Sequence, residues 1–231
     1  MDNSPLIILR NVKKTYRVGT VDIHALRGVD LTLDKGEICC VVGRSGSGKS
    51  TLLNVLAGLE KPTSGEIIIS RMRIERMTQS ELIRFRQDKV GFIFQSFNLM
   101  PYYTALENVA FPLVFRGISK QKRLEAARKI LKAVGLETHL QHKPMQLSGG
   151  QQQRVGIARA LVSDPEIVFA DEPTGNLDSK TSDEVIRIIC DIARERGKTL
   201  IMVTHDPNMA AYTDKAIHLL DGQITDIEQR A

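Results

Sequence analysis

The sequence predicts an α/β fold with a mostly parallel sheet, a β-rich N-terminal part and an inserted helical part. Three observations predict it. Short, continuous apolar runs at residues 38–42, 167–170 and 199–203 are typical of parallel strands buried on both faces. An amphipathic helix, residues 179–196, separates two of these runs, and a glycine-rich turn follows the first. The 231 residues suffice for one such domain with a full core.

The glycine-rich turn joins the apolar run 38–42 to a helix-prone run that begins at Thr51. It fits the spacing G-x-x-x-x-G-K-[ST], in which glycines bring backbone N–H groups to a polyphosphate, the lysine reaches the outer phosphates and the hydroxyl ligates Mg²⁺. Its residues are Gly43, Arg44, Ser45, Gly46, Ser47, Gly48, Lys49 and Ser50, and Thr51 after them is also expected to bind the nucleotide. An ordinary strand-to-helix turn is the alternative, but every motif position is filled and the flanking runs are of the correct type. The turn therefore predicts a P-loop NTPase core.

Charge and cysteine content favour a cytosolic protein with anionic ligands. The chain has 32 Lys and Arg against 27 Asp and Glu, a net charge of +5, without a basic block of the kind that binds nucleic acid. Cys39, Cys40 and Cys190 have neither zinc-site nor disulfide-framework spacing, so they are interpreted as reduced thiols of the core.

The sequence predicts no direct insertion into a membrane. Residues 1–5 lack the basic flank and apolar region of a signal peptide. No apolar run approaches the roughly 20 residues that cross a bilayer. If the protein works at a membrane, another chain must supply the spanning segments.

The N-terminal elements are expected to be strands at residues 6–12 and 23–33, with turns at Gly19 and residues 34–36. Tyr16 is placed in the first connection, where it is either a surface turn residue or an aromatic platform for a nucleotide base. A strand at 66–69, a helix at 80–88 and a buried strand at 90–94 follow.

From residue 96 to about residue 163 helical periodicity replaces the strand pattern. Helices are predicted at residues 104–115 and 120–134, closed by Gly117 and Gly135. The aromatic start of this region, residues 97–103, is either packed locally or an exposed patch that receives a partner. Strands are predicted again at residues 167–170, 199–203, 216–220 and 223–225. The expected organisation is one domain, 1–231, with an α/β core at 1–95 and 164–231 and a helical subdomain at 96–163.

Four predicted strands end directly in polar groups. Because the carboxyl ends of parallel strands meet at one edge of a sheet, these groups are expected to lie together. Asp171 suits Mg²⁺, directly with Ser50 or through water. Glu172 is placed to orient or deprotonate the attacking water. Gln95 is expected to bind the ion or that water, and His205 the γ-phosphate.

A second glycine-containing turn, residues 147–151, precedes a helical run at residues 152–162. Ser148 is a candidate helix cap, and Gly149 and Gly150 expose backbone donors at the positive end of that helix. The turn is either a plain N-cap or a second anion-binding terminus.

Together these motifs resemble one family, the nucleotide-binding subunits of ABC transporters. The resemblance covers nearly the whole chain and is carried by residues 43–50, Gln95, the signature at 147–151, Asp171 with Glu172, residues 176–178 and His205, in family order. It implies that two subunits pack head to tail, with each ATP between the phosphate loop of one and Ser148, Gly149, Gly150 and Gln151 of the other. Asp178 would then connect the two sites, and Tyr16 would stack on adenine.

The resemblance also implies ATP and Mg²⁺ as cofactors, an ATP-dependent homodimer and integral membrane permease subunits docked near Gln95 and residues 97–103. The chain would lie on the cytoplasmic face of the cell membrane, and the transported molecule would meet the permease. Similarity to the branch that serves macrolide efflux and lipoprotein release is carried by residues 15–19 with 25–26, by 107–109 followed by 112–113 and 116–117, and by 173–179. Two departures from the family pattern are Arg44, in place of a small residue or proline, and residues 71–73, in place of a glycine-bearing turn.

Two other functions compete with this hypothesis. A soluble ABC ATPase that acts on nucleic acid or ribosomes would share the motifs, but such proteins usually have two cassettes or long insertions. A P-loop kinase or GTPase switch would explain residues 43–50 and leave Ser148 and His205 without a role.

Overall fold

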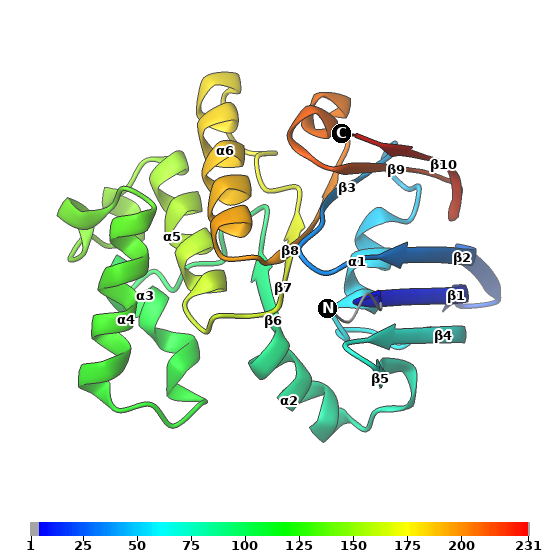
Figure 1. Cartoon of the computed structure of the whole chain (residues 1–231), viewed down its shortest axis with the longest axis horizontal. Helices are drawn as coiled ribbons and strands as arrows, with labels where there is room; N and C mark the ends of the chain where they lie inside the picture. Colours follow the sequence, from blue (N-terminus) through cyan, green and yellow to red (C-terminus); the bar gives the residue numbers. More distant parts are fainter. Residues whose placement is uncertain (1–4, 231) are drawn as a thin grey trace.

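The computed structural model describes residues 5–230, so residues 1–4, on which most of the signal-peptide expectation rests, lie outside the described part. A six-stranded sheet forms the centre, in the order β10-β9-β3-β8-β7-β6 (Figure 1). All neighbours pair in parallel except β10 with β9. The strands are β3 (Ile38–Val42), β6 (Val90–Ile93), β7 (Ile167–Asp171), β8 (Thr199–Thr204), β9 (Lys215–Leu220) and β10 (Gln223–Gln229). The predicted mostly parallel sheet is confirmed.

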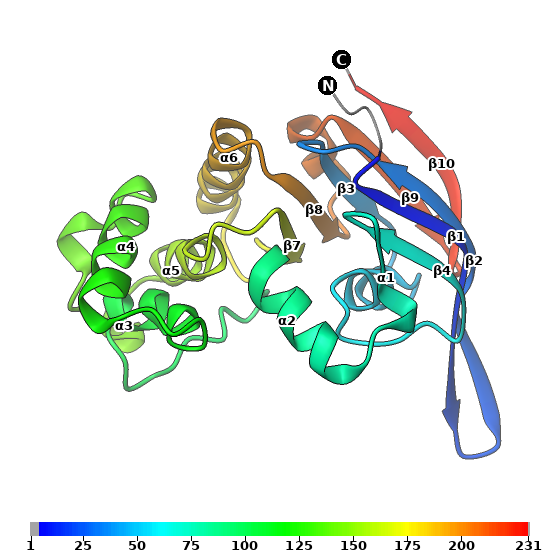
Figure 2. The ribbon, with the colours of Figure 1, turned by 60° about the horizontal axis from the view of Figure 1, so that its bottom comes forward.

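A second, antiparallel sheet has the order β2-β1-β4-β5. Its strands are β1 (Ile7–Val18), β2 (Val21–Leu33), β4 (Ser64–Ile69) and β5 (Met72–Arg73). The prediction that Tyr16 lies in a connection is wrong, because β1 continues to Val18 and pairs Tyr16 with Ile23. The resulting β1–β2 hairpin projects from the body of the molecule (Figure 2). The outer part of this hairpin is exposed, so it has no buried face and its sequence lacks the alternation of apolar and polar residues that predicts a strand.

The turn between β4 and β5 is tight although it lacks glycine. Ser70 and Arg71 both have left-handed backbones, with φ of 49° and 66°. Two such residues are what a two-residue hairpin turn requires. The departure from the family pattern at residues 71–73 therefore leaves the hairpin intact.

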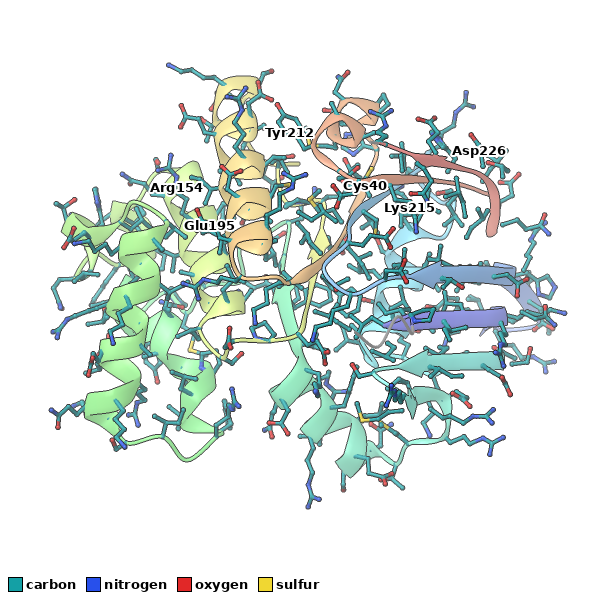
Figure 3. All side chains as sticks on the ribbon, in the orientation of Figure 1. Cys40, Arg154, Glu195, Tyr212, Lys215 and Asp226 are labelled. Atoms are coloured by element: carbon teal, nitrogen blue, oxygen red, sulfur yellow. The ribbon has the colours of Figure 1, made fainter. Side chains whose placement is uncertain are left out.

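Helix α1 (Lys49–Leu56) lies between the two sheets (Figure 2). Alternate residues of β3 serve different cores: Cys39 packs with α1, α2 (Gln79–Lys89) and the antiparallel sheet, whereas Cys40 packs with the helices on the other face. All three cysteines are buried and free, as predicted. Burial raises the pKa of the Cys190 thiol to about 12, so it is unreactive. Figure 3 shows Cys40 and Lys215 on the neighbouring strands β3 and β9.

The helical part gathers α3 (Ala105–Ala110), α4 (Lys120–Ala133) and α5 (Gly149–Leu161) at one end of the molecule (Figure 1). Helix α6 (Ser179–Glu195) lies beside α5, and the two helices pack on the sheet at different strands, α5 on β6 and α6 on β3 and β8. The prediction of one helix over residues 104–115 is correct only in its first half. A 3₁₀ turn, Phe111–Val114, replaces the rest, because Pro112 has no N–H to donate to the carbonyl four residues before it. The other 3₁₀ turns are Ile74–Arg76, Glu137–His139, Pro144–Gln146 and Pro207–Tyr212.

Helix α5 begins at Gly149, three residues before the predicted start. The glycines obscured its start because glycine is a poor helix former. Ser148 compensates for them with a side-chain cap. Among residues 5–230, no helix combines the length and apolarity that crossing a bilayer would need.

Candidate functional site

The four polar strand ends lie side by side. Strand β3 pairs with β8, β8 with β7 and β7 with β6, all in parallel and in a register that aligns their carboxyl ends. Gly43, Gln95, Asp171 with Glu172, and His205 therefore follow neighbouring strands at one edge of the sheet. The prediction that these four groups follow neighbouring parallel strands and lie at one edge of the sheet is confirmed.

The phosphate loop wraps around the amine of Lys49. Lys49 is 5% exposed, and its Nζ donates to the carbonyl oxygens of Gly43 at 2.8 Å and Arg44 at 3.0 Å. An ammonium has three donors, so one proton remains for an anion. Gly48 precedes α1 with φ of 103°, and a Cβ there would collide with the carbonyl of Ala25 on β2. Glycine is required at this position for both reasons.

Ser50 and Asp171 form the candidate magnesium site. The Ser50 hydroxyl donates to Asp171 Oδ1 at 3.2 Å. Burial raises the pKa of Asp171, and the nearby Glu172 carboxylate raises it further. The Ser50 hydrogen bond and the charge of Lys49 oppose this shift. A hydroxyl paired with a carboxylate matches what Mg²⁺ accepts, since this ion takes few protein oxygens and keeps several waters.

Glu172 is held from several sides. Its backbone is left-handed, with φ of 42°, and its N–H donates to Val203 O at 3.0 Å. Its Oε2 lies 2.9 Å from Nδ1 of His205. Backbone strain of this kind gathers at functional sites, where the surroundings enforce it. Gly175 lies close to this carboxylate: a Cβ at Gly175 would come within 3.3 Å of Glu172 Oε2 and 2.7 Å of Gln95 Nε2.

Glu172 borders two adjoining hollows. One, of about 540 Å³, is lined by the phosphate-loop residues Ser45, Gly46, Gly48, Lys49, Ser50 and Thr51. The other, of about 510 Å³, is lined by His205, Gly175 and the first turn of α6. A carboxylate at their border can act on a water beside a phosphate bound in the loop.

Part of the wall of the phosphate-loop hollow comes from residues that the sequence did not predict at the site. Asp22, Ile23, His24, Ala25 and Arg27 of β2 line it, together with Asp221 and Gly222 between β9 and β10. No signal in the sequence marks these residues, because they come from an exposed strand and a distant turn. Only the packing of β2 against the loop brings them in.

Tyr16 is fixed by hydrogen bonds beside α1. Its hydroxyl donates to Glu60 Oε2 at 2.6 Å, and Lys14 Nζ lies 4.9 Å from the ring centre. Burial raises the pKa of Tyr16, the Glu60 hydrogen bond raises it further, and a hydrogen bond with Thr51 lowers it. Tyr16 is therefore held close to the helix that begins at Lys49. It does not line the phosphate-loop hollow among the residues described.

Ser148 caps α5 and Asp178 caps α6. The Ser148 hydroxyl accepts from the N–H of Gln151, whose side-chain oxygen accepts from the N–H of Ser148. Asp178 Oδ1 accepts from the N–H of Thr181 at 3.0 Å. None of the residues 148–151 is among those that line the phosphate-loop hollow in the described part of the chain. The structure thus brings the strand-end groups together and leaves the signature turn apart from them.

The aromatic segment 97–103 is partly packed and partly exposed. Phe97 is half-buried beside Gly149, and its carbonyl accepts from Arg159 at 2.7 Å. Tyr102 is 85% exposed. The segment is therefore packed locally at Phe97 and exposed at Tyr102, and the expectation that the exposed end receives a partner stays a prediction. Arg44 also has an exposed side chain, and its carbonyl holds Lys49.

The sequence of the chain is similar to those of known proteins. The model of the family described as ABC transporter matches residues 26–175. An uncharacterised ABC transporter ATP-binding protein of Methanocaldococcus jannaschii is 48% identical over 95% of each chain. The lipoprotein-releasing system ATP-binding protein LolD of Syntrophotalea carbinolica is 46% identical, over 95% of this chain and 97% of its own. The macrolide export ATP-binding/permease protein MacB of Syntrophobacter fumaroxidans is 46% identical over 95% of this chain, which spans only 31% of that longer protein.

Solved structures give the same answer for the fold. A dimeric, post-hydrolysis ATP-binding cassette bound to ADP and Pi superimposes with a TM-score of 0.89. It is 46% identical, with 97% of this chain and 99% of that one covered. The predicted P-loop core with an antiparallel β subdomain and a helical subdomain is confirmed. These names are transporter names and lend no support to the alternative of action on nucleic acid or ribosomes.

Proposed function

The chain belongs to the ABC transporter family, and from this premise we propose that two copies pack head to tail around ATP and drive a separate membrane permease. The chain itself is an ATP-binding, ATP-hydrolysing transporter subunit. The geometry of the dimer, the roles of individual residues and the kind of transport are the proposed part.

One observation carries the head-to-tail arrangement. The phosphate-loop hollow is open and contains no residue of the signature turn among those described, although Ser148, Gly149 and Gly150 form a capped helix start that suits an anion. A second copy can bring its signature turn to this hollow. The dimeric relative bound to ADP and Pi supports such an assembly.

Each strand-end group has a proposed role around the triphosphate. Lys49 and the loop N–H groups bind the outer phosphates, and Glu172 orients or deprotonates the attacking water. His205 and Gln95 contact the γ-phosphate and that water. Ser50 and Asp171 would hold Mg²⁺, which would neutralise phosphate charge when bound.

Tyr16 is proposed as the adenine platform, and Asp178 as the link between the two sites. The α6 cap fixes Asp178 between Leu177 and Ser179, which both line the hollow that contains His205. A carboxylate in this position can transmit the arrangement of one site to the other across a dimer.

The exposed end of segment 97–103 is the proposed permease contact. Tyr103 lines a groove together with Leu106, Phe111 and Val114, and the exposed Tyr102 precedes it in the chain. Only Ser96 separates this segment from Gln95, so movement at the γ-phosphate would reach it through a few residues. By analogy with the efflux and lipoprotein-release relatives, we propose export or extraction, with the chain on the cytoplasmic face of the membrane.

The variant Glu172→Gln tests the proposal. The amide cannot accept the water proton, so we expect turnover to fall by roughly 10²- to 10⁴-fold while ATP binding persists. A stable ATP-bound dimer should accumulate and elute early in size-exclusion chromatography. ATP turnover by the unaltered chain under the same conditions is the control, and a variant that binds ATP as a monomer would refute the shared site.

A further inference from the structure

The signature turn is supported by a histidine that no motif predicted. His139 ends the 3₁₀ turn Glu137–His139, and its Nε2 lies 3.2 Å from Nε2 of Gln151. Its other ring nitrogen, Nδ1, lies 3.0 Å from the hydroxyl of Thr138. His139 is half-buried, and its ring centre is 4.9 Å from that of His142.

The capping box fixes which way the Gln151 amide points. Its Oε1 accepts from the N–H of Ser148 at 3.0 Å, while the Gln151 N–H donates to the Ser148 hydroxyl at 3.3 Å. The amide nitrogen, which only donates, must then face His139. Nε2 of His139 is therefore an acceptor, and the ring proton resides on Nδ1, where it donates to Thr138.

The loop that carries His139 is itself fixed. The carbonyls of Leu140 and His142 accept from the N–H groups of Leu106 at 3.0 Å and Ala105 at 2.8 Å, at the start of α3. His139 thus connects α3 to α5 through one hydrogen bond to Gln151. Helices α3 and α5 both belong to the group at one end of the molecule (Figure 1).

We propose that His139, as the neutral Nδ1–H tautomer, is a positioning residue that holds Gln151 and thereby orients the Ser148 hydroxyl. Because that hydroxyl accepts from the Gln151 N–H, its own proton is left to donate outward. A ring with N–H at Nε2 would oppose two donors and turn the Gln151 amide, which would break the bond to the Ser148 N–H. The inference rests on the proposed function only in that Ser148 meets the nucleotide of a second copy.

The tautomer is measurable without nucleotide. Long-range ¹H–¹⁵N correlation of the chain with ¹⁵N-labelled histidines at about pH 8 distinguishes the two tautomers. The chain has five histidines, and the spectrum of His139→Gln assigns the signal of His139 by its loss. We expect a proton on Nδ1. A proton on Nε2 would overturn the proposal.

Dimerisation tests the positioning itself. In the Glu172→Gln background, the ATP concentration that gives half-maximal dimer is compared among variants by size exclusion. His139→Leu removes one hydrogen bond at each site and should raise that concentration about fivefold or more. His139→Gln offers a carbonyl oxygen to Gln151 and should restore most of the affinity. Fluorescent-ATP binding to the monomer should be equal in all variants, which verifies that they fold.

The matched control is His218→Leu, which removes a histidine paired with Glu228 at 2.9 Å on the β9–β10 hairpin. It should leave dimerisation unchanged. The role of His139 would be refuted if His139→Leu dimerised at the same ATP concentration as the Glu172→Gln background. It would also be refuted if His139→Leu and His139→Gln raised that concentration equally. If the Glu172→Gln background never dimerises, the proposed function fails instead, and the tautomer still decides what His139 does.

Discussion

At the scale of single residues, the site depends on short polar contacts between groups far apart in sequence. Ser50 reaches Asp171, and Glu172 reaches His205, at 3.2 and 2.9 Å. Neither pair is predictable as a contact from spacing alone. Both arise because parallel strands align their last residues at one edge.

Lys49→Ala tests the phosphate loop. The change removes the ammonium donor and also frees the carbonyls of Gly43 and Arg44. A hydrogen bond from a charged group contributes about 1.5–3 kcal/mol, so we expect ATP affinity to fall roughly ten- to hundredfold and turnover to be lost. Fluorescent-ATP titration and phosphate release measure the two effects. Lys35→Ala, at an exposed lysine beside Glu166, is the control and should retain both activities.

Gly175→Ala tests the packing around Glu172. The new methyl would come within 2.7 Å of Gln95 Nε2 and displace that side chain, which is flexible at its end, so the fold should survive. We expect turnover to fall about tenfold or more with ATP binding retained, since misplacement of reacting groups by about 1 Å can cost a hundredfold. Gly156→Ala makes only ordinary contacts, the nearest at 3.6 Å, and should leave phosphate release unchanged. Equal turnover in Gly175→Ala and the unaltered chain would argue against a role for this close packing.

At the scale of elements, the helices around the site are defined by their N-terminal caps. Capping boxes begin α2 at Thr78, α3 at Thr104 and α5 at Ser148. Each satisfies backbone donors that the helix cannot satisfy itself. The box of α5 also places the signature serine, so one local device provides both stability and a proposed binding group.

Thr104→Ala should destabilise the fold by about 1 kcal/mol, because it removes the hydroxyl that caps α3. The backbone hydrogen bond from Thr104, and then its hydroxyl, lower the pKa of Glu107 below its ordinary value of 4.5. The ionised carboxylate therefore stabilises the fold above that pH, and its contribution is lost as the pH falls through the lowered pKa. Urea unfolding of the variant and the unaltered chain should show a difference that shrinks on acidification. Thr104→Ser keeps the hydroxyl and should lose little stability at any pH.

At the scale of the whole molecule, the two helix starts proposed to bind the nucleotide have different surroundings. The start of α1 lies between the sheets, whereas the start of α5 belongs to the helical group at one end (Figure 1). The phosphate-loop hollow takes its walls from β2 and the β9–β10 turn instead of from α5. In the arrangement proposed above, a second molecule would supply the remaining wall of this hollow.

Ser148→Arg tests this requirement. A bulky side chain at the exposed cap should keep two copies apart, so we expect no ATP-dependent dimer in the Glu172→Gln background. Binding of fluorescent ATP to the phosphate loop of the monomer should be unchanged. Ser119→Arg is the matched control, because Ser119 precedes α4, is exposed and makes no side-chain cap. Dimerisation by Ser148→Arg at the same ATP concentration as the control would contradict the shared pocket.

The strand and helix order of the core was predictable because its signals are local. The buried runs that became β3, β7 and β8 are continuous, and α6 has a clear apolar face. Local signals failed at the exposed β1–β2 hairpin, at Pro112 and at the glycines of α5. The hairpin has no buried face, Pro112 lacks the N–H that would continue α3, and the Ser148 cap lets α5 begin at its glycines. Hydrophobic periodicity reports none of these causes.

The sequence by itself determined the phosphate loop, the polar groups at the strand ends and the edge at which they meet, because spacing sets the loop and parallel topology sets the edge. Only the tertiary structure decided that β2 walls the hollow, that Tyr16 is held by Glu60, and that His139 supports Gln151. These contacts join residues whose distance in space cannot be calculated from their separation in the sequence. They exist because two sheets and a helical group pack against one another, and packing is a property of the folded chain.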